Sequence, residues 1–583
     1  MTEGDGAKPR APSNSTTATR NRVLSTLARA SRLLTTEPPA VGRLSGEAVF
    51  LIAAVLAQWV AVAVLVFSVE RNGWLFYQGG DQTFFYTIAW IVSHGHLPVT
   101  GIGYAWSLVE APIAAVAGPS FLNALPGIIA IQVVLLLPLG LVAFYGTAKR
   151  LLGPTVARLV VVAWVAAPYA VIPLFVGRYH IRWVDQTLPQ LLGLSGMGDF
   201  ASMVLLMSAA YLLFRHIDEG GWETAALAGL VAGFALGLKP SAGLFLAGAA
   251  AGLLLAHRLR GLAAFAIALA PAVLTLAVWK QRSLGNLPLF ASYGGTELAA
   301  GAQISLDRVV AAGIHKYVDL DWNHLGRNLD GIREYFWSNR LVEWLPIAGM
   351  LGALRRSLPK AALLGAWLGA YVIVKGTAST ASVDSASFWR LLAPAWPAYL
   401  LLAVSIVALV PTLGGRLGTQ TSEPVPHSFR RTLVAGAVVL GILPLVITAA
   451  LPRDSVNRAF RDDARNLYSA IDPSFHVDAR VRRDAVTLTW RGPHSASTRP
   501  TYLILKVPST GSAQDGYGCN QAPVPRCAIH MTELGYHSSP YVDHPGPGRW
   551  VYRVAQAASY TGAPDEGDPL VYSEPVKVTV GSP

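Results

Sequence analysis

The chain has 583 residues, of which 52% are hydrophobic and only 14% are charged. Soluble domains carry about a quarter charged residues, so this composition argues against a soluble protein and favours one that lies largely in a membrane. The formal net charge of +12 comes from basic residues in short loops and in the N-terminal tail, as the positive-inside rule expects, and does not indicate a nucleic-acid partner.

The first apolar segment runs from residue 47 to 69 and has no charged residue after Glu47. At about 1.5 Å per residue, a helix of this length crosses a hydrocarbon core of about 30 Å. The segment is too long, and too far from Met1, for an ordinary signal peptide, so we expect an uncleaved transmembrane helix. Residues 1–44 carry seven Lys or Arg against three acids and are rich in Ser, Thr, Ala and Pro, which predicts a disordered cytoplasmic tail.

Apolar segments recur eleven times along the chain. They cover residues 47–69, 122–147, 155–176, 200–216, 222–238, 241–257, 261–279, 341–354, 360–376, 391–411 and 432–451. Several are short, and the pair within 222–257 could instead form a re-entrant hairpin. Basic residues follow every second segment, which places those ends in the cytoplasm. The sequence thus predicts a polytopic α-helical domain of about eleven transmembrane helices over 45–452, in the plasma membrane, with its N-terminus in the cytoplasm and its C-terminus outside.

The long connections fall on the outer side in this topology. They are residues 70–121, 177–199, 280–340 and 377–389, together with everything after 452. Connections of this length are uncommon unless they have a function or are disordered. We therefore expect the functional site at the outer face of the membrane.

Residues 453–583 change to the alternating pattern of β-strands. The clearest segments are AVTLTWRG (485–492), PTYLILKV (500–507), GRWVYRVAQA (548–557) and VYSEPVKVTV (571–580), with Pro- and Gly-containing turns between them. This arrangement resembles a fibronectin type III domain, which implies a small extracytoplasmic β-sandwich. Cys519 and Cys527 lie in this part, and a close pair of cysteines outside the cell suggests a disulfide.

One carboxylate stands where the chain leaves the first apolar segment, in FYQGGDQTFFYTIAWIVSHGHLP (76–98). Asp81 follows two glycines and precedes a helix-like run. It is either a helix N-cap, whose carboxylate accepts hydrogen bonds from backbone N–H groups, or a catalytic group. Taken alone, these residues favour the cap.

Five further stretches of the sequence follow the first outer loop. They are GYAWSLVEAPIAAVAG (103–118), FYGTAKRLLG (144–153), GDFASMVLLMSAAYLLFRH (198–216), LAGLVAGFALGLKPSAGLFL (227–246) and FWRLLAPAWPAYLLLA (388–403). Together with the first outer loop they resemble, over roughly residues 45–410, the GT-C membrane glycosyltransferases, and most closely the branch of protein mannosyltransferases and aminoarabinose transferases. Many members have a second acid directly after the first, where this chain has Gln82, so the resemblance implies a single base here.

The resemblance implies that a sugar is moved, with inversion, from a polyprenyl-phosphate donor to an acceptor hydroxyl on the outer face. A hydroxyl is a poor nucleophile and needs a base within hydrogen-bond reach, a role we assign to Asp81. The lipid-phosphate leaving group gains negative charge, which a cation stabilises. Lys239, before Pro240 inside an apolar region, and Arg390, at the start of a late apolar segment, are the candidates. Their alternative role is to reach and anchor the membrane interface.

The other candidate residues are substrate contacts. Tyr86 matches the tyrosine that follows the acid in the first outer loop of the family, and the resemblance implies that it contacts the substrate. In the 177–199 connection, Arg178, His180 and Asp185 either bind sugar or phosphate or belong to a solvated loop. Asp199 opens the fourth apolar segment and is either an N-cap or, by the resemblance, the second acid of the site. No cofactor is certain, and if a divalent metal takes part, Asp185 or Asp199 is its ligand.

Two other function classes stay open. A transporter or lipid flippase would show interrupted helices in both halves of the chain, whereas only the Lys239-Pro240 pair interrupts a segment here. A non-catalytic scaffold would only display the β-domain outside the cell. The lack of a Walker-type or dinucleotide-binding motif agrees with a lipid-linked donor. The sugar is not specified by the sequence, nor is the acceptor, which could be a glycan, a lipid or a protein.

Overall fold

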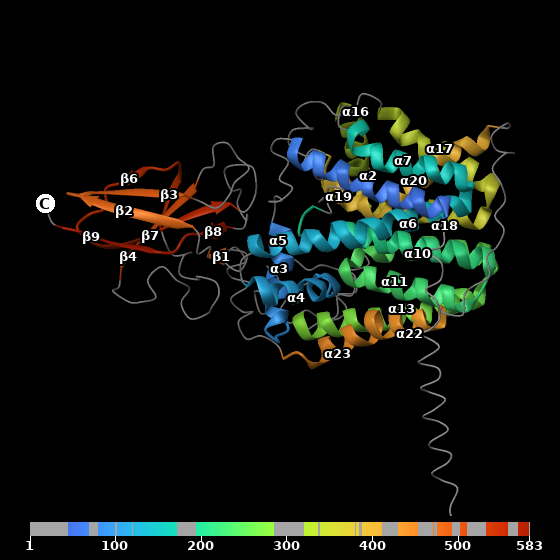
Figure 1. Cartoon of the computed structure of the whole chain (residues 1–583), viewed down its shortest axis with the longest axis horizontal. Helices are drawn as coiled ribbons and strands as arrows, with labels where there is room; N and C mark the ends of the chain where they lie inside the picture. Colours follow the sequence, from blue (N-terminus) through green and yellow to red (C-terminus); the bar gives the residue numbers. More distant parts are fainter. Residues whose placement is uncertain are drawn as a thin grey trace, which may run out of the picture. The chain divides into compact units, whose positions relative to one another are not determined.

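A computed structural model describes most of the chain (Figure 1). The described residues are 45–68, 80–98, 102–118, 121–171, 194–284, 320–335, 339–378, 381–383, 387–410, 429–452, 470–471, 475–491, 502–509, 532–557 and 570–581. The predicted disordered tail and the predicted Cys519–Cys527 disulfide lie outside these ranges.

Helices make up the described residues up to 452. The first group is α2 (Gly46–Ser68), α3 (Gly80–Ser93), α4 (Ala105–Ala117), α5 (Phe121–Ala130), the π-helical turn η1 (Ile131–Leu136), α6 (Leu137–Leu152), α7 (Pro154–Val171) and α10 (Asp199–Glu219). The second group is α11 (Trp222–Leu238), η3 (Pro240–Leu244), α12 (Phe245–Leu255), α13 (Leu259–Leu284), α16 (Trp322–Tyr335), α17 (Asn339–Arg356), α18 (Leu358–Gly376), α19 (Ser387–Leu392), η4 (Ala393–Ala395), α20 (Trp396–Val404), η5 (Ser405–Leu409), α22 (Phe429–Gly436), η6 (Ala437–Ile442) and α23 (Leu443–Ala450).

Seven helical stretches of the described chain are long and apolar enough to cross a membrane, so the protein is a membrane protein by helix length and composition. They are Gly46–Ala63, Ala124–Leu152, Asp199–Glu219, Leu259–Arg282, Leu358–Gly376, Ser387–Leu409 and Arg431–Ala450. All seven coincide with predicted segments. Three other predicted segments correspond to shorter apolar helices, and the segment 341–354 lies in α17, which is not among the seven because charged residues occupy both of its ends. The count of eleven therefore stays a prediction.

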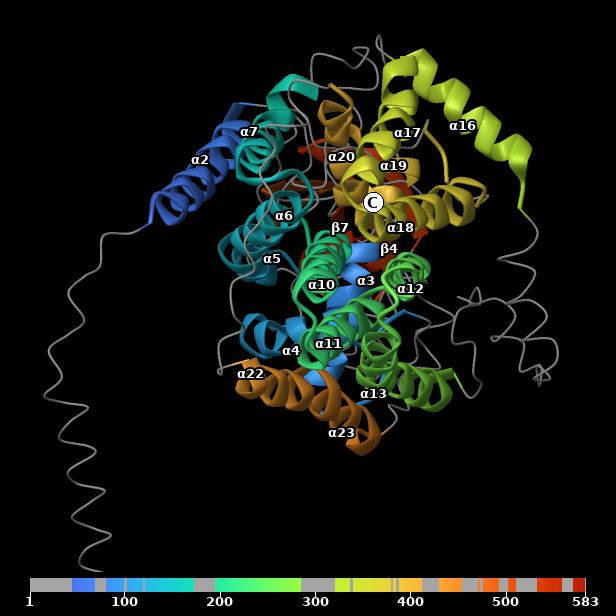
Figure 2. The same cartoon turned by 90° about the vertical axis from the view of Figure 1, so that its right-hand side faces the viewer.

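Helix α10 is apolar between its ends, and 14 of its 21 residues are buried. It packs against α6 and α11, and Figure 2 shows it between them. A helix that is apolar on all sides is typical of the interior of a bundle. Its 21 residues are about 31 Å long, close to a hydrocarbon core of about 30 Å. The two ends of α10 are therefore far enough apart to reach opposite faces of a membrane.

Contacts between segments far apart in the sequence bring the ends of α13 and α23 and the turn after α3 to one end of this bundle. Arg282, in the last turn of α13, donates to the carbonyl oxygen of Ala449 in α23 at 2.7 Å. The backbone N–H of Leu97, after α3, donates to the carbonyl oxygen of Pro452 at 2.7 Å. The last described residues of the helical part thus meet the turn between α3 and α4.

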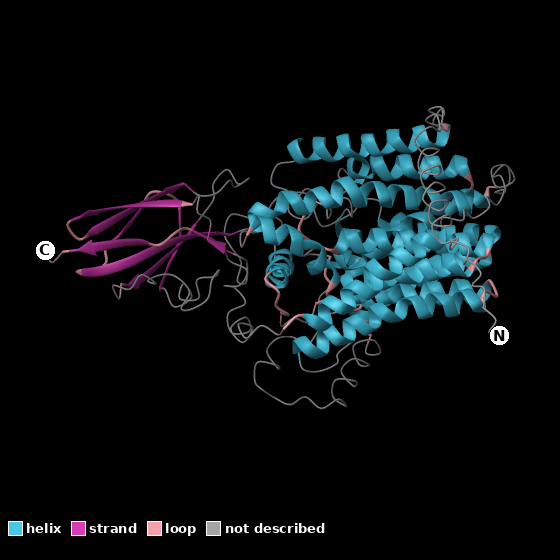
Figure 3. Ribbon diagram, turned by 60° about the horizontal axis from the view of Figure 1, so that its bottom comes forward, coloured by secondary structure: helices cyan, strands magenta, loops and turns pink. Residues whose placement is uncertain are grey.

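Strands make up the described residues from 470 on (Figure 3). They are β1 (Ala470–Ile471), β2 (His476–Arg482), β3 (Ala485–Arg491), β4 (Tyr502–Pro508), β5 (Thr532–His537), β6 (Tyr541–Asp543), β7 (Gly548–Ala557), β8 (Leu570–Tyr572) and β9 (Val576–Val580). One sheet has the order β2-β3-β6, and the other has the order β1-β8-β7-β4-β5, with β9 also paired to β7. Side chains of β3 and of β4, β7 and β9 share one apolar core, which includes Leu488, Ile504, Val554 and Val578.

The predicted strands at 485–492, 500–507 and 548–557 are confirmed as β3, β4 and β7. The predicted strand 571–580 is wrong as one element, because it divides into β8 and β9. Both pair with β7, β8 through Ala555–Ala557 and β9 through Gly548–Tyr552. Pro575 lies between them and has no N–H to donate to a ladder, which accounts for the interruption. Two small sheets are present, while their assignment as a fibronectin type III-like sandwich stays a prediction.

Candidate active site

Three residues predicted from the sequence meet at the start of α10. The ammonium of Lys239 donates to Asp199 Oδ1, and the guanidinium Nε of Arg390 lies 3.8 Å from Asp199 Oδ2. The side chain of Asp199 is 2% exposed, whereas those of Lys239 and Arg390 are each 20% exposed. We call these three residues the ion cluster. Because it holds two cations and one anion, its formal charge is +1, and the cations remain within reach of a ligand.

Lys239 lies at a break between two helices. Helix α11 ends at Leu238, and Lys239 has an extended backbone with φ −140° and ψ 112° before Pro240 begins η3. A residue that precedes proline avoids the helical region for steric reasons, so the Lys-Pro pair dictates this break. The interruption expected from the sequence is thus observed, and it brings the lysine to the end of α11 that lies beside Asp199.

The end of α11 is fixed by a close approach of two backbones. A Cβ atom on Gly103 would lie 2.0 Å from the carbonyl oxygen of Gly237, so no side chain fits there. The indole N–H of Trp279 in α13 donates to the carbonyl oxygen of the neighbouring Ile102 at 3.2 Å. The segment before α4 therefore packs between α11 and α13, and its contact on α11 is Gly237, two residues before Lys239.

Arg390 is carried by the short helix α19, and the chain before it is anchored by Asn328 of α16. The Asn328 side chain is 4% exposed, and its amide donates to the carbonyl oxygens of Ala381 at 3.0 Å and Gly376 at 3.2 Å. Its own carbonyl oxygen accepts from the N–H of Val383 at 3.1 Å. A buried amide that satisfies three backbone groups holds this segment in one conformation, which limits where Arg390 can lie.

Residues 194–198 lead into α10 and are held by side chains from three other elements. Gln82 Oε1 of α3 accepts from the N–H of Gly196 at 3.0 Å, and Trp106 Nε1 of α4 donates to the carbonyl oxygen of Gly196 at 2.9 Å. Gln132 Nε2 of η1 donates to the carbonyl oxygens of Ser195 at 2.6 Å and Met197 at 3.2 Å. We call residues 194–198 the clamped loop.

The start of α10 argues against the N-cap interpretation of Asp199, while its role as the second acid of the site stays a prediction. The N-cap of α10 is Gly198, and Asp199 is the first helical residue. Its carboxylate therefore faces Lys239 and Arg390, in a position where the helix dipole also favours a negative charge.

The other predicted site residues are only partly placed. Helix α3 begins at Gly80, so Asp81 occupies its first turn, next to the Gln82 that bonds the clamped loop. The side chain of Asp81 lies outside the described residues, and so do Arg178, His180 and Asp185. Their roles stay predictions.

Tyr86 is 2% exposed, and its hydroxyl donates to the carbonyl oxygen of Gly118 after α4. This contact joins α3 to the end of α4. The predicted substrate contact of Tyr86 stays a prediction.

Sequence reasoning missed Glu110, a fully buried carboxylate on α4. Glu110 lies close enough to Tyr86 for the two side chains to interact electrostatically. Burial raises the pKa of Glu110 well above its ordinary value. A lone acid in the apolar stretch 103–118 was the available signal. The stretch lies in the predicted outer connection 70–121, whereas Ala105–Ala117 forms the helix α4, which is buried on one face.

A divalent metal does not fit the described part of the ion cluster. No group of three His, Cys, Asp or Glu side chains among the described residues is placed to hold a metal ion. Both carboxylate oxygens of Asp199 face cationic side chains. The role of Asp199 as a metal ligand is therefore not supported by its contacts, and Asp185 lies outside the described residues.

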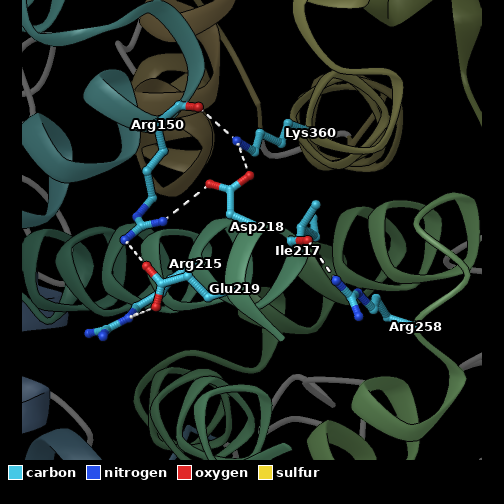
Figure 4. A network of polar contacts seen from close by, with 7 residues as sticks. All are labelled: Arg150, Arg215, Ile217, Asp218, Glu219, Arg258 and Lys360. Atoms are coloured by element: carbon cyan, nitrogen blue, oxygen red, sulfur yellow. Dashed lines mark hydrogen bonds and ion pairs between the residues drawn. The ribbon is translucent and has the colours of Figure 1, made fainter. Parts of the chain in front are cut away.

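A second charged cluster lies at the opposite end of α10 (Figure 4). The guanidinium of Arg150 contacts Asp218 at 3.2 Å and Glu219 at 2.6 Å, and Arg215 contacts Glu219 at 2.8 Å. Lys360 of α18 contacts Asp218 at 2.6 Å and donates to the carbonyl oxygen of Arg150 at 2.7 Å. Arg150 and Arg215, at two of the basic ends that the sequence predicts to be cytoplasmic, thus lie in one cluster at the far end of α10 from Asp199.

No family model and no curated protein sequence matches this chain. Solved structures that it resembles include the Archaeoglobus fulgidus oligosaccharyltransferase in the apo form (13% identity, TM-score 0.38, 70% of this chain and 56% of that chain). They also include the same organism's oligosaccharyltransferase AglB in complex with an inhibitory peptide and a dolichol-phosphate (14% identity, TM-score 0.38, 70% and 55%). A third is the Archaeoglobus fulgidus enzyme in complex with Zn and sulfate (15% identity, TM-score 0.39, 70% and 54%). The chain spans about half the length of these proteins, and a likeness at this level carries no argument about fold or function.

Proposed function

We propose that the chain is a GT-C-like membrane glycosyltransferase that moves a sugar from a polyprenyl-phosphate donor to an acceptor hydroxyl at the outer face of the plasma membrane. The observation that carries the proposal is the ion cluster of Asp199, Lys239 and Arg390 at the end of a buried helix. A polyprenyl-phosphate sugar is a phosphodiester with one negative charge, which the cluster's charge of +1 complements.

In the proposed reaction, Asp81 accepts the proton of the acceptor hydroxyl while the hydroxyl oxygen bonds to the anomeric carbon. The bond from that carbon to the phosphate oxygen breaks, and its electron pair stays on the lipid phosphate. Attack from the face opposite the leaving group inverts the anomeric centre. The phosphate thereby gains a second negative charge, which Lys239 and Arg390 stabilise most strongly as the bond breaks.

Asp199 has a supporting role in this proposal. It holds both cations at one place before the donor arrives, so little reorganisation is needed when the phosphate enters. Since each cation keeps a fifth of its side chain exposed, a phosphate oxygen can approach without breaking the ion pairs.

The dimensions of α10 support an outer location for the site. Arg150, Arg215 and Lys360 lie at the end of α10 opposite Asp199. The positive-inside rule places a basic end in the cytoplasm, and the length of α10 matches the thickness of the membrane core. The ion cluster then lies at the outer face, where a lipid-linked donor can enter sideways from the bilayer.

The test uses the purified protein in detergent, a panel of polyprenyl-phosphate sugars and a mixed acceptor extract. We expect donor turnover by the wild type and none above background by Asp81→Asn. Lys239→Met should lower kcat by about a hundredfold, because it removes a charge-stabilising group from the leaving phosphate. Lys506→Met, which removes a comparably buried lysine that pairs with Asp543 in the strand region, is the matched control and should keep wild-type turnover.

An Asp81→Asn enzyme with wild-type turnover would exclude the proposed base. Turnover of no donor, together with movement of labelled lipid across proteoliposomes, would instead favour the transporter or flippase.

A further inference from the structure

Gln82 is a buried amide that connects two parts of the proposed site. Its side chain is fully buried, and its oxygen accepts a hydrogen bond from the N–H of Gly196, 114 residues further along the chain. Gly196 lies three residues before Asp199, and Gln82 directly follows Asp81. One hydrogen bond therefore joins the first turn of α3 to the loop that leads into the ion cluster.

The clamped loop depends on side chains for its conformation. Both backbone polar groups of Gly196 are bonded to side chains, the N–H to Gln82 and the carbonyl oxygen to Trp106. The Gln132 side chain donates to the carbonyl oxygens of the residues on either side of Gly196. A buried backbone N–H that loses its acceptor costs free energy, so removing the Gln82 oxygen should displace Gly196 rather than leave it in place.

We infer that Gln82 is a positioning residue, which fixes Asp199 and its two cations at a set distance from Asp81. The inference rests on the proposed function, because it assigns the base to Asp81 and the phosphate contact to the ion cluster. It follows from the shared backbone: a shift of the clamped loop moves Asp199, and a shift of Asp199 moves Lys239 and Arg390 with it. Misplacing reacting groups by about 1 Å can lower a rate by about a hundredfold.

Three variants separate positioning from a general effect on folding. Gln82→Met keeps the length of the side chain but has no oxygen to accept from Gly196. Gln82→Glu keeps an oxygen acceptor. Gln58→Met is the matched control, because Gln58 on α2 is also fully buried and forms no hydrogen bond with any described residue.

Two measurements do not depend on turnover. Hydrogen exchange, followed by mass spectrometry, reports the protection of the amides of residues 195–199. The rate at which an amine-acylating reagent labels Lys239 reports whether its ammonium is still held by Asp199, and Asp199→Asn serves as the positive control for release. Gln82→Met should exchange at these amides about tenfold faster and label Lys239 several-fold faster, whereas Gln82→Glu and Gln58→Met should match the wild type.

The third measurement is donor turnover. Gln82→Met should lower kcat about tenfold while KM for the donor changes less than about threefold, because a positioning defect acts on the transition state more than on binding. Gln82→Glu should keep most of the wild-type kcat. If Gln82→Met and Gln82→Glu have the same melting temperature, a purely structural role of Gln82 would not predict this difference in kcat.

Unchanged exchange and labelling in Gln82→Met would overturn the inference, and so would equal changes in Gln58→Met. Faster exchange with wild-type kcat would also overturn it, because the loop would then not position the reaction. If the wild type turned over no donor, the proposed function would fail, while exchange and Lys239 labelling would still decide whether Gln82 places Asp199.

Discussion

Glu110 is an acidic residue whose surroundings do not suit a charged carboxylate. Its side chain is fully buried on α4, outside the seven long apolar stretches, and Trp106, Ala111 and Ala114 of the same helix belong to an apolar cluster. Burial disfavours the charged form and raises the pKa of Glu110 well above its usual 4.5. The folded protein therefore holds this proton at pH values where the unfolded chain has released it.

This burial predicts a pH dependence of stability. Above about pH 4.5 the unfolded state loses the Glu110 proton and the folded state keeps it, so the free energy of unfolding falls as pH rises, by at most about 1.4 kcal/mol per pH unit. Glu110→Gln removes the titration. We expect its melting temperature to equal that of the wild type near pH 5 and to exceed it near pH 8.

The matched control is Glu334→Gln, which changes an exposed glutamate and should shift the melting temperature equally at both pH values. A difference between wild type and Glu110→Gln that is the same at pH 5 and pH 8 would show that Glu110 does not carry the effect.

At the residue scale, the sequence pointed to the three charged residues of the ion cluster but not to the neutral side chains that bond the clamped loop. Asp199, Lys239 and Arg390 stand out because each interrupts or opens an apolar run, and a charge there needs a reason. Gln82 and Gln132 give no such signal, because their bonds are to the backbone of a loop far away in the chain. Only the fold brings them to that loop, so no local pattern could have revealed their role.

Among the helices, α6, α10 and α18 are joined by ion pairs, of which the pair of Arg150 and Glu219 is the more buried. Glu219 is 5% exposed and lies between the guanidinium groups of Arg150 and Arg215. Removing one partner of a buried pair leaves an uncompensated charge, which costs about 3–5 kcal/mol. These ion pairs therefore stabilise the packing of the bundle at its basic end.

We expect Glu219→Gln to lower the melting temperature clearly in detergent, in line with a loss of about 3 kcal/mol. Asp330→Asn is the control: it removes a pair with Arg333 on α16 in which the acid is 73% exposed, and it should leave the melting temperature unchanged. Equal effects of both substitutions would contradict a special role for the buried cluster.

The elements themselves were largely readable from local patterns. The break at Lys239 follows from the proline after it, and three strands follow from their alternation. The helix α4 was not expected, because its residues lie in the predicted connection 70–121, and it packs against α3 and α11. Which helices meet at the ion cluster depends on contacts between segments far apart in sequence, and no periodicity encodes those contacts.

For the whole molecule, the positive-inside rule and the basic end of the bundle predict one orientation in the membrane. His96, exposed beside the Leu97–Pro452 contact, should face outward, and Arg260, exposed at the start of α13, should face the cytoplasm. With Cys519 and Cys527 changed to Ser, a membrane-impermeant maleimide should label His96→Cys in intact cells and Arg260→Cys only after permeabilisation. The reverse pattern would invert the topology and place the ion cluster in the cytoplasm.

The hydrogen bond between Leu97 and Pro452 has a consequence for everything that follows in the chain. Only residues 453–469 connect Pro452 to β1, and a chain of that length spans at most about 60 Å when fully extended. The strands are therefore tethered to the turn after α3 by these residues. A molecule captured by them would be kept at a local concentration that can reach about the millimolar range. If the proposed transfer reaction is correct, even weak capture of an acceptor by the strands would keep it close to the helical part of the chain.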